Sequence, residues 1–183
     1  TTCSACVSSS QAIGYGYEAI KHGQQEVMVC GGAEELHFTH AGVFDIMYAT
    51  STKYNDRPAL SPRPFDANRD GLVVGEGAAT VILESYSRAK ARGAHIYAEI
   101  LGDGTNCDGQ HITRPSWQGM AGAMRLALED AKLDKSAIGY INAHGTATEL
   151  GDIAESQATL AVLGDQTPVS STKSYTGHTL GAC

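Results

Sequence analysis

The sequence predicts an α/β protein in which helices are layered against a largely parallel β-sheet. Short apolar runs of strand length, such as residues 26–30 and 78–84, alternate with longer segments of helical pattern. Residues 119–133 place their apolar side chains on one face of a helix, as an amphipathic helix requires. Glycines follow several of these segments, where helices commonly end. This alternation of strands and helices is typical of α/β folds.

Each expected element is delimited by its own pattern. The first helix, 11–22, ends at Gly23, and Gly14 and Gly16 inside it predict a close approach to another backbone. The other expected helices are 41–49, 85–92, 119–133 and 150–163. The expected strands are 26–30, 78–84, 96–101, 138–143 and 169–171. Residues 53–70 form an expected polar loop, held by charge pairs among Arg63, Asp66, Arg69 and Asp70.

Composition excludes several classes of function. The 183 residues are 42% hydrophobic and 18% charged, which suits one globular domain with a substantial core. A net charge of -7 excludes the basic surface of a nucleic-acid-binding protein, and no apolar run is long enough to span a membrane. The glycine-rich residues 71–77 lack the pattern of a nucleotide-binding loop. Five cysteines, an odd number, favour a reducing cytoplasm.

Cys6 lies where the first helix begins, among small residues and serines. Serine favours helix N-caps, and the positive end of a helix dipole would favour a thiolate at this position. Three other interpretations of the cysteine remain open here. Cys6 could be a buried structural residue, or form a thioredoxin-like redox pair with Cys3 in a C-x-x-C motif. Half of a zinc site is the weakest of these, because no second ligand pair follows.

Two histidines and a lysine follow predicted strands near the end of the chain. His144 follows the strand 138–143, and Lys173 and His178 follow the strand 169–171. Active residues of α/β folds gather beyond the carboxyl ends of the strands. A thiolate suits acyl transfer between thioesters, neutral imidazoles that donate hydrogen bonds stabilise an oxyanion, and a nearby ammonium favours the thiolate. We therefore expect one site built from these residues and Cys6.

Short motifs along the whole chain carry a specific resemblance. They are Ser4-Ala5-Cys6, Gly31-Gly32-Ala33-Glu34-Glu35, Ser51 to Asp56, Arg63-Pro64-Phe65-Asp66 with Arg69-Asp70-Gly71, His144 to Thr148 with Gly151-Asp152, and Ser171-Thr172-Lys173 with Gly177-His178. In this order they resemble the β-ketoacyl-acyl-carrier-protein synthases, condensing enzymes with a thiolase-like layered α/β/α/β/α fold. Phe44-Asp45-Ile46-Met47 with Ser51 to Asp56 is most similar to the bacterial elongating type.

The resemblance implies a decarboxylating condensing enzyme of fatty-acid synthesis. Cys6 would accept the acyl group, and His144 and His178 would serve malonyl decarboxylation and stabilise the enolate, with the division of duties between them left open. Lys173 would support the histidines, and Glu155 would pair with Lys173. Because the carboxylate leaves as carbon dioxide, neither a metal nor a redox cofactor is expected.

The resemblance also implies how substrates are held. Thr146 and Thr148 would bond the phosphopantetheine arm of an acyl-carrier protein, and Phe44 would line the acyl pocket, although an ordinary core position also explains Phe44. The acyl-carrier protein is the expected partner, and the complete protein is expected to form a homodimer. Cys3 has no role in the family pattern.

The ends of the chain suggest an internal fragment. Residues 1–104 would be the end of the N-terminal half of a synthase and residues 105–183 the start of the C-terminal half, so we expect the chain alone to be inactive. Three alternatives remain: a polyketide ketosynthase, a non-catalytic partner subunit of the same fold, and the redox protein. The presence of Cys6 with both histidines argues against the non-catalytic subunit.

Overall fold

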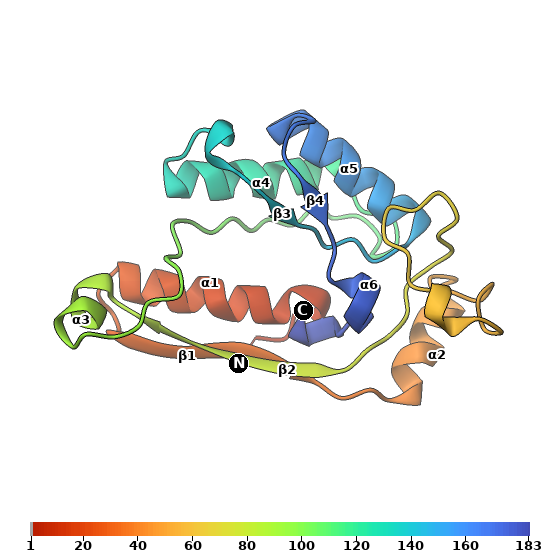
Figure 1. Ribbon diagram of the computed structural model, residues 1–183, viewed down its shortest axis with the longest axis horizontal. Helices are drawn as coiled ribbons and strands as arrows, with labels where there is room; N and C mark the ends of the chain where they lie inside the picture. The colour runs from red at the N-terminus through yellow and green to blue at the C-terminus, as the bar shows by residue number, and fades with distance from the viewer. Residues whose placement is uncertain (1) are drawn as a thin grey trace.

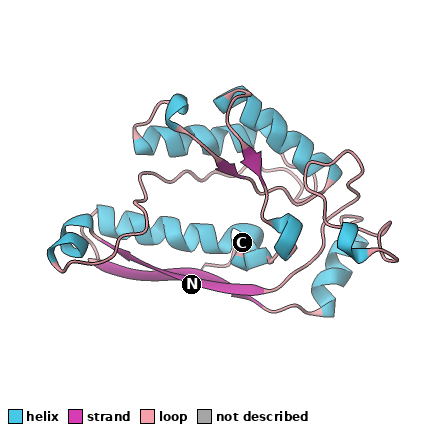
Figure 2. Cartoon of the chain, viewed as in Figure 1, coloured by secondary structure: helices cyan, strands magenta, loops and turns pink. Residues whose placement is uncertain are grey.

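A computed structural model describes residues 2–183. The helices are α1 (Ser8–Lys21), α2 (Phe38–Ile46), α3 (Tyr86–Ala91), α4 (Trp117–Ala131), α5 (Glu149–Leu163) and α6 (Lys173–Thr176). The strands are β1 (Val27–Glu34), β2 (Gly77–Glu84), β3 (Ile141–Asn142) and β4 (Val169–Ser170). In Figure 1, α1 lies along β1 and β2, and α4 and α5 lie beside β3 and β4. Figure 2 shows how much irregular chain connects these two layers.

The two strand pairs run in different directions. β1 and β2 are antiparallel over their full length, from Val27 opposite Glu84 to Glu34 opposite Gly77. β3 and β4 are parallel over two residues each. The predicted largely parallel sheet is therefore wrong for β1 and β2. Apolar runs locate strands, but their direction depends on a hydrogen-bonding partner that lies elsewhere in the sequence.

One predicted strand is not paired. Residues 96–101 belong to no strand ladder within residues 2–183. Instead, the segment passes beside α1, and the Tyr17 hydroxyl donates to the carbonyl of Leu101 at 3.0 Å. The segment has the apolar pattern of a strand, but its main chain forms no ladder of hydrogen bonds with another strand.

Helix α1 packs closely because two of its residues have no side chain. A Cβ atom on Gly16 would lie 2.4 Å from Cys30 Sγ on β1 and 3.1 Å from Leu83 Cδ1 on β2. A Cβ atom on Gly14 would lie 2.8 Å from the Asp103 carboxylate. Close packing at both glycines is therefore present, but the neighbouring atoms belong to side chains and not to the backbone that was predicted.

The second layer has its own apolar core. Ala121 on α4 is buried against Ala158 and Val162 on α5, with larger apolar side chains around them: Met120, Met124, Leu128 and Leu163. The Ser116 hydroxyl accepts from the Gly119 N–H and so caps α4. The amphipathic helix predicted at 119–133 is confirmed, and both of its ends lie two residues earlier than predicted. None of the helices described in residues 2–183 combines the length and apolar character needed to cross a membrane.

The loop at 53–70 is held mainly by carboxylates. Arg63 donates to Asp66 at 3.0 Å, as expected. Asp70, in contrast, accepts from the Ser51 hydroxyl and from the N–H groups of Thr52 and Lys53. Arg69 reaches out of the loop to Asp152 on α5, at 3.3 Å. The charge pairs predicted within the loop are therefore correct for one pair only.

Candidate active site

Cys6 lies in a short 3-10 turn, Ala5–Val7, immediately before α1. Ala5 has φ 49°, a left-handed conformation that is costly for a residue with a side chain. No serine caps α1: the N-cap is Val7, and the Ser8 hydroxyl instead accepts from the Ser4 N–H and donates to the Ala5 carbonyl. The predicted serine cap is therefore absent, and the Ser8 hydroxyl instead stabilises the turn that contains Cys6.

His178 is held by the glycine-rich segment 71–77. Its N–H donates to the Val73 carbonyl at 2.7 Å, and its carbonyl accepts from Gly75 at 2.9 Å. A Cβ atom on Gly75 would lie 2.2 Å from the Thr176 carbonyl, so this approach requires glycine. The sequence pattern of these glycines excluded a nucleotide-binding loop, and it gave no sign of their role in positioning His178.

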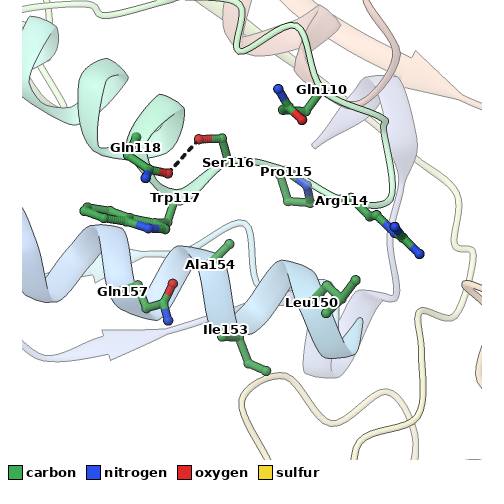
Figure 3. A pocket seen from close by; sticks show the side chains of 10 residues that line it. All are labelled: Gln110, Arg114, Pro115, Ser116, Trp117, Gln118, Leu150, Ile153, Ala154 and Gln157. Atoms are coloured by element: carbon green, nitrogen blue, oxygen red, sulfur yellow. Dashed lines mark hydrogen bonds between the residues drawn. The ribbon is translucent and has the colours of Figure 1, made fainter.

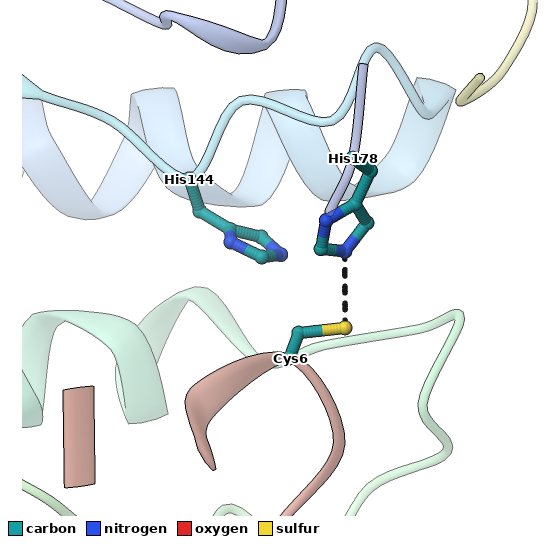
Figure 4. Close-up of side chains that lie close together, drawn as sticks. All are labelled: Cys6, His144 and His178. Carbon is teal, nitrogen blue, oxygen red and sulfur yellow. Dashed lines mark hydrogen bonds between the residues drawn. The ribbon is translucent and has the colours of Figure 1, made fainter. Parts of the chain in front are cut away.

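Cys6, His144 and His178 come together from three distant parts of the chain. The Cys6 Sγ lies 3.0 Å from His178 Nε2. The two imidazole rings are perpendicular, with an interplanar angle of 88° and centroids 5.2 Å apart. One sulfur or nitrogen atom from each residue lies within 4.8 Å of the others. Figure 4 shows the His178 ring pointing at the sulfur and the His144 ring beside it, so the three residues lie together as the sequence predicted.

The hydrogen bonds of His178 define which of its nitrogens carries the proton. Its Nδ1 accepts from the Leu180 N–H at 3.2 Å, so the proton of the neutral ring lies on Nε2 and points to the Cys6 sulfur. Cysteine with two histidines has donor types suited to zinc, yet a protonated Nε2 has no lone pair for a metal. This tautomer suits hydrogen-bond donation to a thiolate or an oxyanion.

Both histidines are uncharged at neutral pH. Burial, followed by the charges of His144 and Lys173, lowers the pKa of His178 to about 3. Desolvation and the charge of Lys173 lower the pKa of His144 to about 4. Part of the His144 surface remains exposed, which weakens desolvation, but even an ordinary histidine pKa leaves a mostly neutral ring at pH 7.

The protonation state of Cys6 differs from the prediction. Burial raises its pKa to about 11, helped by the neighbouring Cys183, and Lys173 only partly opposes this. The thiolate that the helix dipole was expected to favour is therefore not the resting form at neutral pH. The reason is that desolvation of a half-buried sulfur outweighs the helix dipole and the ammonium.

Glu155 holds the turn that carries His144. Its two carboxylate oxygens accept from the N–H groups of His144 and Gly145, both at 2.7 Å. Lys173 is buried, at 7% exposure, and its charge reaches Glu155. The expected ion pair is nevertheless absent from the salt bridges among residues 2–183, so the main-chain N–H groups are the direct partners of Glu155.

Two of the proposed substrate-binding residues directly follow this turn in the chain. Thr146 and Thr148 are adjacent, with their Oγ1 atoms 3.0 Å apart. Phe44 is half-buried on α2, and its place in an acyl pocket stays a prediction. Asp152, which was predicted only as part of a motif, accepts from the N–H groups of Phe65 and Ala147 and is 1% exposed.

An open groove of about 760 Å³ lies between the start of α4 and the start of α5. Figure 3 shows Trp117 lying over Gln157, and Leu150 and Ile153 farther along α5. The other lining residues are Gln110, Arg114, Pro115, Ser116, Gln118 and Ala154. The lining includes none of the three residues Cys6, His144 and His178, so this groove is separate from their cluster.

Comparisons with known proteins agree with this geometry. The model of the β-ketoacyl synthase N-terminal domain matches residues 1–89, and that of the C-terminal domain matches residues 97–183. The chain is 49% identical over 180 residues to 3-oxoacyl-[acyl-carrier-protein] synthase 1 of Haemophilus influenzae and 45% identical to that of Escherichia coli. Each match covers 98% of this chain and 44% of the relative, so the chain spans less than half the length of these relatives.

Solved structures show the same fold. A β-ketoacyl synthase from Burkholderia phymatum is 65% identical and superposes with a TM-score of 0.97, over 100% of this chain and 44% of that one. A type II polyketide ketosynthase in complex with its acyl-carrier protein is 38% identical with a TM-score of 0.93, over 97% and 45%. The chain therefore belongs to the β-ketoacyl synthase family and has the thiolase-like α/β fold.

Proposed function

We propose that this chain carries the reacting groups of a condensing enzyme that joins an acyl thioester to malonyl-acyl-carrier protein in fatty-acid synthesis. The observation that supports the proposal most directly is the His178 Nε2 atom, which lies 3.0 Å from the Cys6 sulfur with the His144 ring beside it. Higher identity to 3-oxoacyl-acyl-carrier-protein synthases than to the polyketide ketosynthase favours fatty-acid substrates.

Three steps follow from these residues. The Cys6 sulfur attacks the thioester carbonyl and displaces the carrier thiol, which takes the proton, so one thioester replaces another. Neutral His144 and His178 then donate hydrogen bonds to the malonyl thioester oxygen as carbon dioxide leaves, stabilising the enolate. The enolate carbon attacks the acyl group on Cys6 and releases the Cys6 thiolate, which His178 Nε2–H stabilises.

Lys173, Glu155, Thr146 and Thr148 support these steps in the proposal. The buried ammonium of Lys173 keeps the site electropositive. Glu155 fixes the main chain at His144. The adjacent hydroxyls of Thr146 and Thr148 would bond the phosphopantetheine arm, and Phe44 would line the acyl pocket. No metal or redox cofactor is required, because decarboxylation drives carbon–carbon bond formation.

We also propose the partners and the compartment of the working protein. The partner is an acyl-carrier protein, because one of the similar solved structures is a type II polyketide carrier in complex with its ketosynthase. A homodimer is proposed from the family resemblance, and size-exclusion chromatography with light scattering would test it. The cytoplasm is proposed because Cys3, Cys6, Cys30, Cys107 and Cys183 are all free thiols.

Separating the two half-reactions tests the mechanism. In the full-length protein that contains this chain, Cys6→Ala should abolish condensation but leave decarboxylation, which needs only a bound malonyl thioester and the histidines. His144→Ala should slow decarboxylation about a hundredfold or more, because a lost oxyanion donor typically costs about 3 kcal/mol. Lys173→Ala should also slow both reactions. The measurement is carbon dioxide release from malonyl-acyl-carrier protein, beside formation of the β-ketoacyl product.

His95→Ala provides a matched control, because His95 lies in the connection after α3 and packs on Tyr97 at 4.5 Å rather than on the cluster. The control should decarboxylate and condense at the parent rate. Parent-like carbon dioxide release by the His144 variant would remove its enolate-stabilising role. Acylation of a cysteine other than Cys6, mapped by mass spectrometry, would remove the nucleophile assignment.

A further inference from the structure

A second thiol lies beside the nucleophile. The Cys183 Sγ donates to the Cys6 carbonyl oxygen at 3.2 Å. Because a carbonyl oxygen lies about 2.4 Å from its own Cα, the Cys183 sulfur lies within about 6 Å of the Cys6 Cα. The Cys183 sulfur lies about 2.8 Å from its own Cα, so the Cα atoms of Cys6 and Cys183 are at most about 8.4 Å apart. This bound includes the span of about 4.4–6.8 Å over which disulfides join two residues.

The main chain around both cysteines is fastened in place. The Ser9 hydroxyl at the start of α1 donates to the Cys183 carbonyl. The Gly181 N–H donates to the Glu34 carboxylate at the end of β1 at 3.1 Å. Both cysteines are half-buried, whereas Cys3, the other cysteine near the nucleophile in sequence, is exposed. The fold therefore presents Cys183, rather than Cys3, to the Cys6 turn.

The ammonium group of Lys173 affects the pKa of both Cys6 and Cys183. The charge of the buried Lys173 lowers the pKa of the Cys183 thiol, against the stronger effect of burial. The same ammonium favours the Cys6 thiolate. Thiol–disulfide exchange requires a thiolate as the attacking group, so the neighbouring ammonium assists exchange at either sulfur.

We propose that Cys6 and Cys183 form a reversible disulfide that protects and switches off the nucleophile when low-molecular-weight disulfides accumulate. The Cys6 thiolate attacks one sulfur of oxidised glutathione and releases one glutathione thiolate. The Cys183 thiolate then attacks the Cys6 sulfur, which forms the protein disulfide and releases the second thiolate. Two protein thiols are oxidised, one external disulfide is reduced to two thiols, and the released thiolates take up the two protons.

This proposal rests on the proposed function only in one respect, namely that a blocked Cys6 cannot be acylated. The bond itself is tested without an activity assay. The full-length protein is incubated with graded ratios of oxidised to reduced glutathione, quenched with acid and N-ethylmaleimide, and digested without reductant. Mass spectrometry should find a linked peptide pair containing Cys6 and Cys183, and dithiothreitol should release it.

Two matched variants sharpen the experiment. Cys3→Ala should still form the Cys6–Cys183 link. Cys183→Ala and Cys183→Ser should both stop at a glutathione adduct on Cys6, and the serine retains a donor for the Cys6 carbonyl if the alanine variant fails to fold. A lasting glutathione adduct on Cys6 of the unmodified protein, or a Cys3–Cys6 link, would overturn the proposal.

Acylation of Cys6 in the same samples separates this proposal from the proposed function. Oxidation should reduce acylation by acyl-carrier thioester at least tenfold, and dithiothreitol should restore it. Fully reduced protein that is never acylated at Cys6 would count against the proposed function, even where the disulfide forms. Acylation that proceeds normally with no disulfide at any glutathione ratio would count against this inference alone.

Discussion

At the scale of single residues, the Cys6 thiol is the group whose environment matters most. Burial raises its pKa to about 11, while the Nε2–H group of His178 points at the sulfur from 3.0 Å. The resting site therefore holds a thiol beside neutral imidazoles. The donor for negative charge is in place before the charge forms, which is the arrangement that lowers an activation barrier without reorganisation.

The pH dependence of alkylation measures this environment. Iodoacetamide reacts with thiolate, so labelling of Cys6 should rise about tenfold for each pH unit between pH 7 and 9, without reaching a plateau. Lys173→Met should slow labelling of Cys6 further, because the ammonium favours the thiolate. The exposed Cys3 provides an internal comparison in the same mass-spectrometric digest. A plateau in Cys6 labelling near pH 7 would show that the thiolate is the resting form.

At the scale of elements, the site depends on how α1 and α5 are fixed. Gly16 lets α1 lie against β1 and β2, which places the Cys6 turn at the end of that layer. Asp152 and Glu155, one turn apart on α5, bind the main-chain N–H groups of Ala147 and His144. Each helix thus positions one side of the Cys6–His144 pair.

Adding a methyl group to α1 tests the first contact. Gly16→Ala should lower the free energy of unfolding by about 1–3 kcal/mol, because the new Cβ would overlap Cys30 Sγ at 2.4 Å. Gly42→Ala in α2 is the matched control, since nothing lies within 4 Å of its Cβ position. The control should gain up to about 1 kcal/mol from helix propensity. Urea titration of the full-length protein measures both, and equal effects would contradict the packing argument.

Removing the buried carboxylate tests the second contact. Asp152→Ala should cost about 3–5 kcal/mol of unfolding free energy, because Arg69 and two N–H groups lose a buried partner. Asp165→Ala, at an exposed carboxylate beyond α5, should change stability by less than about 0.5 kcal/mol. Urea titrations that give the two variants the same stability would show that Asp152 does not hold the turn.

At the scale of the whole molecule, the two neutral histidines link stability to pH. Burial lowers the pKa of His178 to about 3 and that of His144 to about 4. Below about pH 6.5 these histidines are protonated in the unfolded chain but not in the folded chain. The free energy of unfolding therefore falls as the pH drops toward the folded-state pKa values. Burial of His178 therefore disfavours its protonation in the folded protein.

An acid titration measures this linkage. Between pH 7 and pH 4 the full-length protein should lose stability, and His178→Gln should reduce that loss by up to about 3 kcal/mol. His22→Gln, at an exposed histidine after α1, should leave the slope of stability against pH unchanged. Urea titrations at each pH provide the data. Identical slopes for the parent and the His178 variant would mean that His178 is not buried in its neutral form.

The grouping of the candidate site residues and most of the helices could be predicted from the amino-acid sequence alone. The motifs at Cys6, His144 and His178 predicted one site, because the two histidines follow predicted strands and Cys6 lies at the start of a predicted helix. The amphipathic pattern of 119–133 located α4 within two residues. These properties are local: a helical face or a motif is complete within a few turns of chain.

The direction of β1 and β2, the partner of Glu155 and the protonation of Cys6 emerged only from the folded chain. Each of these depends on groups outside the local pattern. A strand takes its direction from its ladder, and Glu155 accepts from the N–H of His144 across a turn. Burial and, less strongly, the neighbouring Cys183 raise the pKa of Cys6. Local pattern therefore indicated the candidate site residues, and burial and long-range hydrogen bonds determined their ionisation and orientation.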